Sequence, residues 1–416
     1  METKRTMAMR WILAFVIFSG LFFSVNGLTT APAWAKQKIL IKVGVPTPLS
    51  GPAGPWGRIG VPADDTFVAL FNQEGFKVGD QIYGFQLIHI DDMNTPEGGA
   101  TAARKLIYED RVKFIAGHWS WNFAAMAAIT NAAKVILITR TGNEAVPGGV
   151  YDPKRMPYTV FGNPAHEQFI ADCQALVKAF PKYKKIGIND SNLGKGIGWD
   201  YVDKELTRLG IRFHHEWYLP GTQDFSPYIN RFAEAGCDII YGAGDVTTAM
   251  LVAKQRYEMG YKDWHTGTVG GIFDPKAYIS VTGSAAAQGF IGQYWANWEF
   301  KETQVDPKLV AMCQQVNQIL TEKTGKPYTH TGWIGWTPNH LMILAQAMQK
   351  AGTVENTDAI MKAIRGGTFS TTVGTFTMSG AKTYGSPVVF GSAGAICQIQ
   401  GDREVYLSES PMAPLP

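Results

Sequence analysis

The chain has 416 residues, with 38 Lys and Arg against 35 Asp and Glu and a formal net charge of +3 at pH 7. It has no basic stripe, so nucleic acid is not an expected partner. Its four cysteines show no CxxC spacing, which gives no support for a zinc or thiol-redox motif.

The first 35 residues have the pattern of a secretory signal peptide. Lys4, Arg5 and Arg10 form a basic N-terminal region, and residues 11–23 are nearly all apolar. Ala33-Trp34-Ala35 then supplies the small residues that signal peptidase accepts. We expect cleavage after Ala35, which leaves 416 − 35 = 381 residues; an uncleaved membrane anchor is the alternative. No later apolar run reaches the ~20 residues of a membrane helix. The mature chain is therefore expected to be exported and soluble, with about two domains.

Export permits disulfide bonds in the mature chain. Cys173, Cys237, Cys313 and Cys397 allow three pairings, among which the sequence does not choose. Reduced, buried thiols are the alternative.

The first part of the mature chain alternates short β-rich runs with amphipathic helical runs. Thr95 is expected to cap a helix over 95–110, with Pro96 as its first residue. The other expected elements are strands at 38–49, 85–92, 112–117 and 135–141, and helices at 60–75 and 123–133.

The same alternation then restarts. Helices are expected at 167–180, 196–210, 225–236 and 247–260, and strands at 184–190, 212–219, 237–244 and 264–271. Region 305–365 is expected to be helical, and 368–407 to form short strands. Alternation of this kind predicts two Rossmann-like α/β lobes, each a mainly parallel sheet flanked by helices.

Loops of distinctive composition follow the expected strands. Ligands of open α/β sheets bind outside the carboxyl ends of the strands, where helix N-termini favour anions. Ser120 and Thr141 are therefore expected to hold a carboxylate, and Trp56, Trp119 and Trp121 to form apolar walls. The loops are 48–57, 117–122, 139–144, 189–196, 242–247 and 270–274.

Each of these residues also has a purely structural interpretation. Ser120 can be a helix cap, and each tryptophan can cover the core. Arg140 can pair with a ligand carboxylate or with a surface acid, whereas His118 is expected to pack or cap. The adjacent His214 and His215 should face opposite sides of a strand.

Enzyme motifs are missing from the sequence. There is no GxxxxGK[ST], GxSxG or HExxH pattern, and the histidines have no metal-ligand spacing. The run GKGIG at 194–198 departs from GxGxxG, so a dinucleotide is not expected. We expect no catalytic residue, no cofactor and no metal.

The ordered set of loops resembles the type I periplasmic solute-binding proteins, specifically the leucine/isoleucine/valine-binding family of ABC transporters. The similarity covers nearly all of 38–407 and is carried by IKVGVPTPLSGPAGPWG, IDDMNTPEGGATAARKLIYEDRVKFIAG, KKIGINDSNLGKGIGWDYVDKEL and YLPGTQDFSPYINRFAEAGCDIIYGAG. The resemblance implies a type I periplasmic binding fold, with a ligand clamped between two lobes that three crossings join. It places 36–160 and 294–370 in one lobe, and 161–293 and 371–416 in the other.

The resemblance also implies a set of ligand contacts. Ser120, Trp121 and Asn122 match one carboxylate-binding loop, Thr141 and Gly142 the next, and Trp56 the bulky residue of the first loop. Leu193 stands where the family often has a tyrosine.

One departure from the family concerns the ligand's ammonium group. Gly271 stands about where amino-acid binders of the family carry an acid, and an ammonium left unpaired in a closed cleft costs several kcal/mol. Asp274 or Asp245 can take over this role, in which case the ligand is an amino acid. Otherwise a hydrophobic or aromatic acid without an amine is expected; an amide or urea is a further alternative.

These inferences predict a monomeric periplasmic protein that is not an enzyme. Its expected partners are a small organic or amino acid and an inner-membrane ABC permease. A periplasmic ligand sensor with the same fold is the alternative function, followed by an exported enzyme.

Overall fold

The computed structural model describes residues 38–411 except for short gaps. The expected signal peptide lies outside the described residues, and no described helix is long and apolar enough to cross a membrane. The gaps are 52–53, 119–121, 141–150, 163–164, 193–194, 196–197, 220, 243–245, 270–274, 295–296, 300–303, 329–330 and 392–393.

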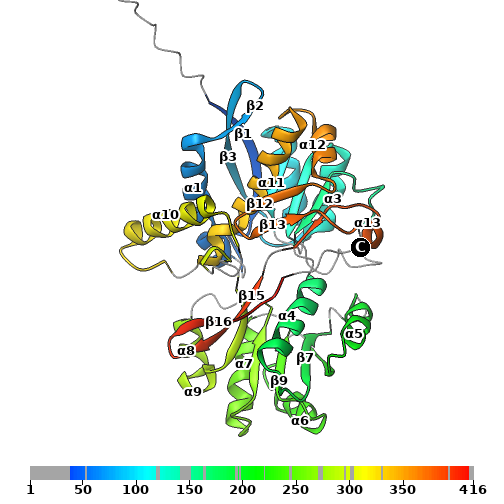
Figure 1. The fold of residues 1–416 in the computed structure, drawn as a ribbon, viewed down its shortest axis with the longest axis vertical. Coiled ribbons are helices and arrows are strands. Elements are labelled where there is room, and N and C mark those ends of the chain that lie inside the picture. Colours follow the sequence, from blue (N-terminus) through cyan, green and yellow to red (C-terminus); the bar gives the residue numbers. More distant parts are fainter. Residues whose placement is uncertain are drawn as a thin grey trace, which may run out of the picture. The chain divides into compact units, whose positions relative to one another are not determined.

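The first sheet has seven strands in the order β14-β6-β5-β4-β1-β3-β2 (Figure 1). All pair in parallel except β2, which runs antiparallel to β3. The strands are β1 (Ile39–Thr47), β2 (Phe76–Val78), β3 (Gln81–Asp91), β4 (Phe114–His118), β5 (Ile136–Arg140), β6 (Thr159–Gly162) and β14 (Val389–Phe390).

Helices cover both faces of the first sheet. The connection from β1 to β3 contains α1 and runs toward one edge of the sheet. The connections from β3 to β4 and from β4 to β5 contain α2 and α3 and run toward the other edge. Because such crossovers are right-handed, α1 lies on one face of the sheet and α2 and α3 on the opposite face. α1 packs with α10 and α11, and α2 packs with α3. The helices are α1 (Gly54–Glu74), α2 (Pro96–Arg104) with a π-helical continuation (Lys105–Glu109), α3 (Phe123–Ala132), α10 (Pro307–Thr324), α11 (Trp336–Ala351) and α12 (Thr357–Ile364).

The second sheet also has seven strands, in the order β16-β15-β11-β10-β9-β7-β8. Its first five strands in sequence are parallel, and β15 and β16 add to β11 as antiparallel strands. The strands are β7 (Ile186–Ser191), β8 (Phe213–Tyr218), β9 (Ile239–Gly242), β10 (His265–Thr268), β11 (Phe290–Tyr294), β15 (Ala395–Gln400) and β16 (Arg403–Glu409).

Alternate side chains of the central strand β9 build two cores in the second sheet. Ile239 and Tyr241 belong to the core under α4 and α5, whereas Ile240 belongs to the core under α6 and α7. The helices are α4 (Ala165–Ala179), α5 (Trp199–Arg208), α6 (Ser226–Glu234), α7 (Val246–Glu258), α8 (Pro275–Thr282) and α9 (Ser284–Ala287). Two such sheets confirm the predicted fold class.

The chain changes sheet three times. It leaves the first sheet after β6, returns to it with α10, and leaves it again between Phe390 of β14 and Ala395 of β15. The third change comes about twenty residues later than the expected boundary at 370/371, because β14 pairs with β6. A two-stranded sheet, β12 (Thr368–Thr371) and β13 (Gly374–Thr377), and helix α13 (Ala381–Tyr384) precede it, and 3-10 turns lie at Asn297–Glu299 and Thr331–Gly335.

Several local predictions are confirmed. Thr95 caps α2 by accepting the N–H of Gly98 at 3.0 Å, and Pro96 is the first helical residue. The adjacent histidines separate as expected: His214 pairs with Glu216 at 2.8 Å, and His215 stacks on Trp217 with the ring centroids 4.1 Å apart. All four cysteines are free and buried.

Strand β4 ends in a bend at Gly117, immediately before the expected ligand loop. The pairing of β4 with β5 is irregular between Ile115 and His118, and Gly117 has a φ of +73°. A Cβ at Gly117 would lie 2.5 Å from Thr337 Oγ1. The Gly117 N–H donates to His340 Nδ1 at 2.8 Å, so α11 fixes the bend.

Gly117→Ala should lower the free energy of unfolding by about 2–4 kcal/mol, because it combines an unfavourable φ with a clash against Thr337. Gly79→Ala is the matched control: its φ is also positive, +58°, but a Cβ there meets open space. The control should lose only about 1–2 kcal/mol. Urea unfolding monitored by tryptophan fluorescence measures both, and equal losses would show that the contact with Thr337 is unimportant.

Candidate functional site

Each sheet has a point where its strand order reverses. In the first sheet the chain runs from β1 to β3 on one side and from β4 to β6 on the other, so the reversal lies between β1 and β4. In the second sheet it lies between β7 and β9. Loops diverge at such points at the carboxyl ends of the strands, and ligands of open α/β sheets bind there.

A pocket of about 280 Å³, open on one side, lies at the reversal point of the first sheet. Its walls come from the carboxyl ends of β1 and β4, the first three turns of α1, and the start of α11. The lining residues are Val45, Thr47, Gly57, Gly60, Val61, Asp64, Gly117, Trp336 and Thr337. We call this the first half-site.

Two consecutive carboxylates at the end of β3 hold the loops around the first half-site. Asp91 Oδ1 accepts the N–H groups of Leu49 and Met93, both at 2.9 Å. Burial favours a higher pKa for Asp91, but hydrogen bonds from Ser50, Leu49 and Met93 outweigh it, so the pKa is lowered. Asp91 is therefore an ionised anchor for the loop that leads into α1.

Asp92 anchors the neighbouring loop. This carboxylate is fully buried and accepts a hydrogen bond from the amide of Asn122 at 2.9 Å, where α3 begins. It also accepts the N–H of Asn94 at 2.9 Å. Burial raises the pKa of Asp92. The hydrogen bond to Asn122 ties the end of β3 to the chain that follows the bend at Gly117.

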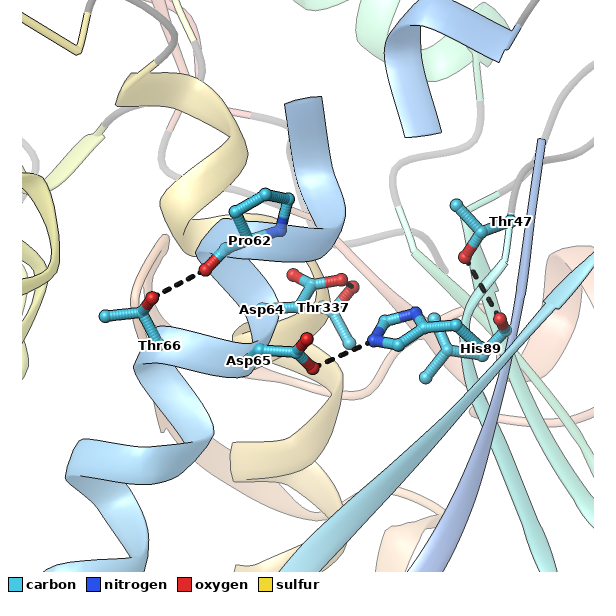
Figure 2. Close-up of polar contacts among 8 residues, drawn as sticks. Thr47, Pro62, Asp64, Asp65, Thr66, His89 and Thr337 are labelled. Carbon is cyan, nitrogen blue, oxygen red and sulfur yellow. Dashed lines mark hydrogen bonds and ion pairs between the residues drawn. The ribbon is translucent and has the colours of Figure 1, made fainter. Parts of the chain in front are cut away.

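Asp64 of α1 lies on the buried face of its helix, facing α11 (Figure 2). Its Oδ2 accepts a hydrogen bond from the Thr337 hydroxyl at 2.7 Å. Burial raises the pKa of Asp64 to about 7, while nearby His89 and the Thr337 hydrogen bond act in the opposite direction. The neighbouring Asp65 is exposed and pairs with His89 Nε2 at 3.1 Å. A titratable carboxyl thus lines the first half-site.

A second pocket, of about 250 Å³, lies near the reversal point of the second sheet, between the sheet and α7. Its described polar groups are neutral amide and hydroxyl groups. Within the described part of the chain, the buried Asn189 Oδ1 and Thr266 Oγ1 have no hydrogen-bond partner. The lining residues are Asn189, Ile240, Gly242, Thr248, Ala249, Val252, Thr266, Gly267 and Thr268. We call this the second half-site.

Of the residues expected to contact a ligand, Asn122 is the one whose side chain the structure describes. It is buried and supports the loop through Asp92, and a ligand contact for it stays a prediction. Trp56 lies in the first turn of α1, and Arg140 is the last residue of β5; the structure describes their backbone but not their side chains. Outside the described residues are Trp119, Ser120, Trp121, Thr141, Gly142, Leu193, Asp245, Gly271 and Asp274.

Sequence patterns did not indicate a site role for Asp64, Thr337 or Thr266, and Asn189 was expected only as the first residue of the loop 189–196. Asp64 carried a usable signal, because it lies four residues after Gly60 and three before Phe67, on the apolar stripe of a helix. The hydrogen bond from Thr337 joins residues 273 positions apart, and local pattern does not show it. Among the described residues, no group of three or more His, Cys, Asp or Glu side chains is placed to hold a metal ion.

Comparison with known proteins decides the family. A family model described as "Periplasmic binding protein" matches residues 40–388, which is most of the chain. The chain belongs to this family. This periplasmic binding protein is 23% identical over 355 residues to Leu/Ile/Val-binding protein homolog 3 of Brucella melitensis, covering 83% of the chain and 89% of the relative. The expected family resemblance is confirmed.

Solved structures of similar fold include two with ligands. One is the branched-chain amino acid transporter substrate binding protein LivJ from Streptococcus pneumoniae in complex with isoleucine, at a TM-score of 0.67 and 16% identity, covering 89% of this chain and 99% of that one. Another is an R. palustris solute binding protein in complex with 4-hydroxybenzoate, at a TM-score of 0.67 and 18% identity. The match covers 91% of this chain and 98% of that one. These similarities support the two-lobed type I fold.

Buried carboxyls should make this binding protein lose stability as pH rises. Burial raises the pKa of Asp64, Asp190 and Glu167 each to about 7, and Glu167 accepts a hydrogen bond from Tyr384 at 2.5 Å. Between about pH 4 and 7 the folded state binds more protons than the unfolded state, so the free energy of unfolding falls as pH rises, by at most ~4 kcal/mol per group.

Asp64→Asn removes one of these titratable groups, so the free energy of unfolding should fall less steeply as pH rises. Urea unfolding at pH 5, 6, 7 and 8 should show the variant gaining stability relative to the unmodified protein as pH rises. Asp65→Asn, at the exposed neighbour, is the control and should follow the unmodified protein. A difference between Asp64→Asn and the unmodified protein that does not change with pH would contradict the assignment of a raised pKa to Asp64.

Proposed function

We propose that the protein is the extracytoplasmic solute-binding component of an ABC importer. The observation that carries the proposal is the pair of half-sites, the first at the reversal point of its sheet and the second near that of the other sheet, between the strands and α7. Three chain crossings connect the two sheets, which is the connectivity of a hinge. A ligand that contacts both half-sites would favour a closed form, because it binds that form more tightly than the open one.

The ligand is a small molecule with a carboxylate and a hydrophobic or aromatic body, or an amino acid. Relatives are named for leucine, isoleucine and valine, and the solved neighbours hold isoleucine and 4-hydroxybenzoate. A carboxylate is the group that these compounds share. Helix N-termini at the strand ends suit such an anion, since their N–H groups point outward.

The roles of individual contact residues belong to this proposal. Ser120, Thr141 and the backbone at Gly142 hold the carboxylate, with Arg140 in support. Trp56, Trp119 and Trp121 wall the ligand's apolar body. On the second sheet, the ligand meets Leu193 and the loops that carry Asp245, Gly271 and Asp274.

The proposal extends to location and partners. The chain is exported to the periplasm, is cleaved near Ala35, acts as a monomer without catalysis, and delivers its ligand to an inner-membrane permease. A ligand sensor that presents its closed form to a receptor is the second candidate, since hinge closure serves either role.

A thermal-shift screen tests the ligand class. The exported protein, unfolded and refolded to remove carried-over ligand, is mixed with leucine, 4-methyl-2-oxopentanoate, phenylalanine, phenylacetate and benzoate. A ligand at ~100 times its Kd adds roughly 2.7 kcal/mol to the free energy of unfolding, enough to raise the Tm by several degrees. Selective shifts by one of these acids support the proposal, and no shift by any of them would contradict the ligand class.

Uptake measurements separate transport from sensing. Deleting the gene for this chain should abolish high-affinity uptake of the radiolabelled ligand, because the permease then receives no loaded binding protein. Restoring the gene on a plasmid should restore uptake and serves as the control. Unchanged uptake in the deletion strain would favour the sensor.

A further inference from the structure

The first half-site contains an acid that the proposed carboxylate grip does not use. Gly57, Gly60, Val61 and Asp64 follow one another along a single face of α1 and line the pocket together. Seven residues of helix separate Gly57 from Asp64, which corresponds to about 10 Å along the axis. The pocket therefore extends from the strand ends, near Thr47 and the loop 48–57, down to the Asp64 carboxyl.

The buried Asp64 carboxyl has few groups to stabilise its charge. Within the described part of the chain, Thr337 is its one hydrogen-bond partner, although a carboxylate has about four acceptor positions. No described Lys or Arg forms an ion pair with it, and the His89 ring contacts the adjacent Asp65 (Figure 2). A buried carboxyl with one neutral donor gains strongly from a second donor, because local water is scarce.

Glycines leave part of the pocket wall beside Asp64 without side chains. Three glycines line the pocket, and at Gly117 a Cβ would press against Thr337 Oγ1, the atom that donates to Asp64. Val45 and Trp336 supply apolar walls. The result is a pocket of mixed polar and apolar lining, with the Asp64 carboxyl at the end farther from the start of α1.

We propose that Asp64 binds a hydrogen-bond donor of the ligand, a hydroxyl or an ammonium group, at the end away from the ligand's carboxylate. This inference rests on the proposed function and names the ligand class more closely. In its ionised form the Asp64 carboxyl repels the ligand's carboxylate, so it also sets the ligand's orientation. A ligand that lacks the donor leaves the carboxyl poorly paired, and sites built to bind a hydroxyl or amine reject such analogues strongly.

Calorimetric titration of the exported protein with matched ligand pairs tests the inference. The pairs are 4-hydroxybenzoate with benzoate, for a hydroxyl donor, and 5-aminopentanoate with pentanoate, for an ammonium donor at the far end of the chain. In at least one pair the donor-bearing member should bind the unmodified protein more than tenfold more tightly. In Asp64→Asn, whose side chain has the same shape, that member should lose about ten- to a hundredfold in affinity. The member without the donor should change less than about twofold.

Asp65→Asn is the matched control, since it removes the adjacent exposed acid, and it should leave all four affinities unchanged. If Asp64→Asn binds every ligand as the unmodified protein does, Asp64 holds only water and the inference is overturned while the proposed function stands. If the unmodified protein binds a pair with equal affinity for both members, the inference also fails for that donor, whether or not the variant folds. Failure to bind any of the four acids would instead overturn the proposed ligand class.

Discussion

The reversal of strand order within a parallel sheet is the constraint on which the structure depends. Parallel strands need crossover helices, and right-handed crossovers in the two directions from β1 place α1 and α2 on opposite faces. The loops after β1 and β4 must therefore part, and the same holds after β7 and β9. The first half-site lies where the loops part, and the second lies near such a point, between its sheet and α7. The pockets are thus a consequence of topology, and side chains decide only what each pocket recognises.

The carboxyls of the first sheet act in two different ways around the first half-site. Asp91 and Asp92 each accept at least two hydrogen bonds, Asp91 from Leu49 and Met93 and Asp92 from Asn94 and Asn122, so they fix loops in place before a ligand arrives. Such preorganisation lowers the entropy that binding must overcome. Asp64, with Thr337 as its described hydrogen-bond partner, has acceptor capacity left. Acids of the same type therefore serve as anchors where donors are plentiful and as recognition groups where donors are few.

The sequence predicted most elements because periodicity and caps act locally, as Thr95 and Pro96 show at the start of α2. It placed the start of α1 at residue 60 instead of Gly54, because Gly54, Pro55 and Gly57 are typical of loops. The two-residue strand β14 has no periodicity to detect, and its pairing with β6 moves the third crossing. Site residues were harder still. The Asp92–Asn122 and Asp64–Thr337 hydrogen bonds, and the unpaired oxygens of Asn189 and Thr266, exist only once distant segments pack together.

The two half-sites differ in chemistry, and under the proposed function the first selects the ligand while the second favours the closed form. The described polar groups of the second half-site are hydroxyls and an amide, which both donate and accept, so they can adapt to a carboxylate, a hydroxyl or water. Above its pKa of about 7 the Asp64 carboxylate only accepts hydrogen bonds, and in that form it distinguishes a donor from an acceptor. Selectivity among acids then depends mainly on the first half-site. Under the proposed function, the second half-site adds contacts to the ligand held by the first, and this gives the differential affinity that a hinged protein needs in order to close.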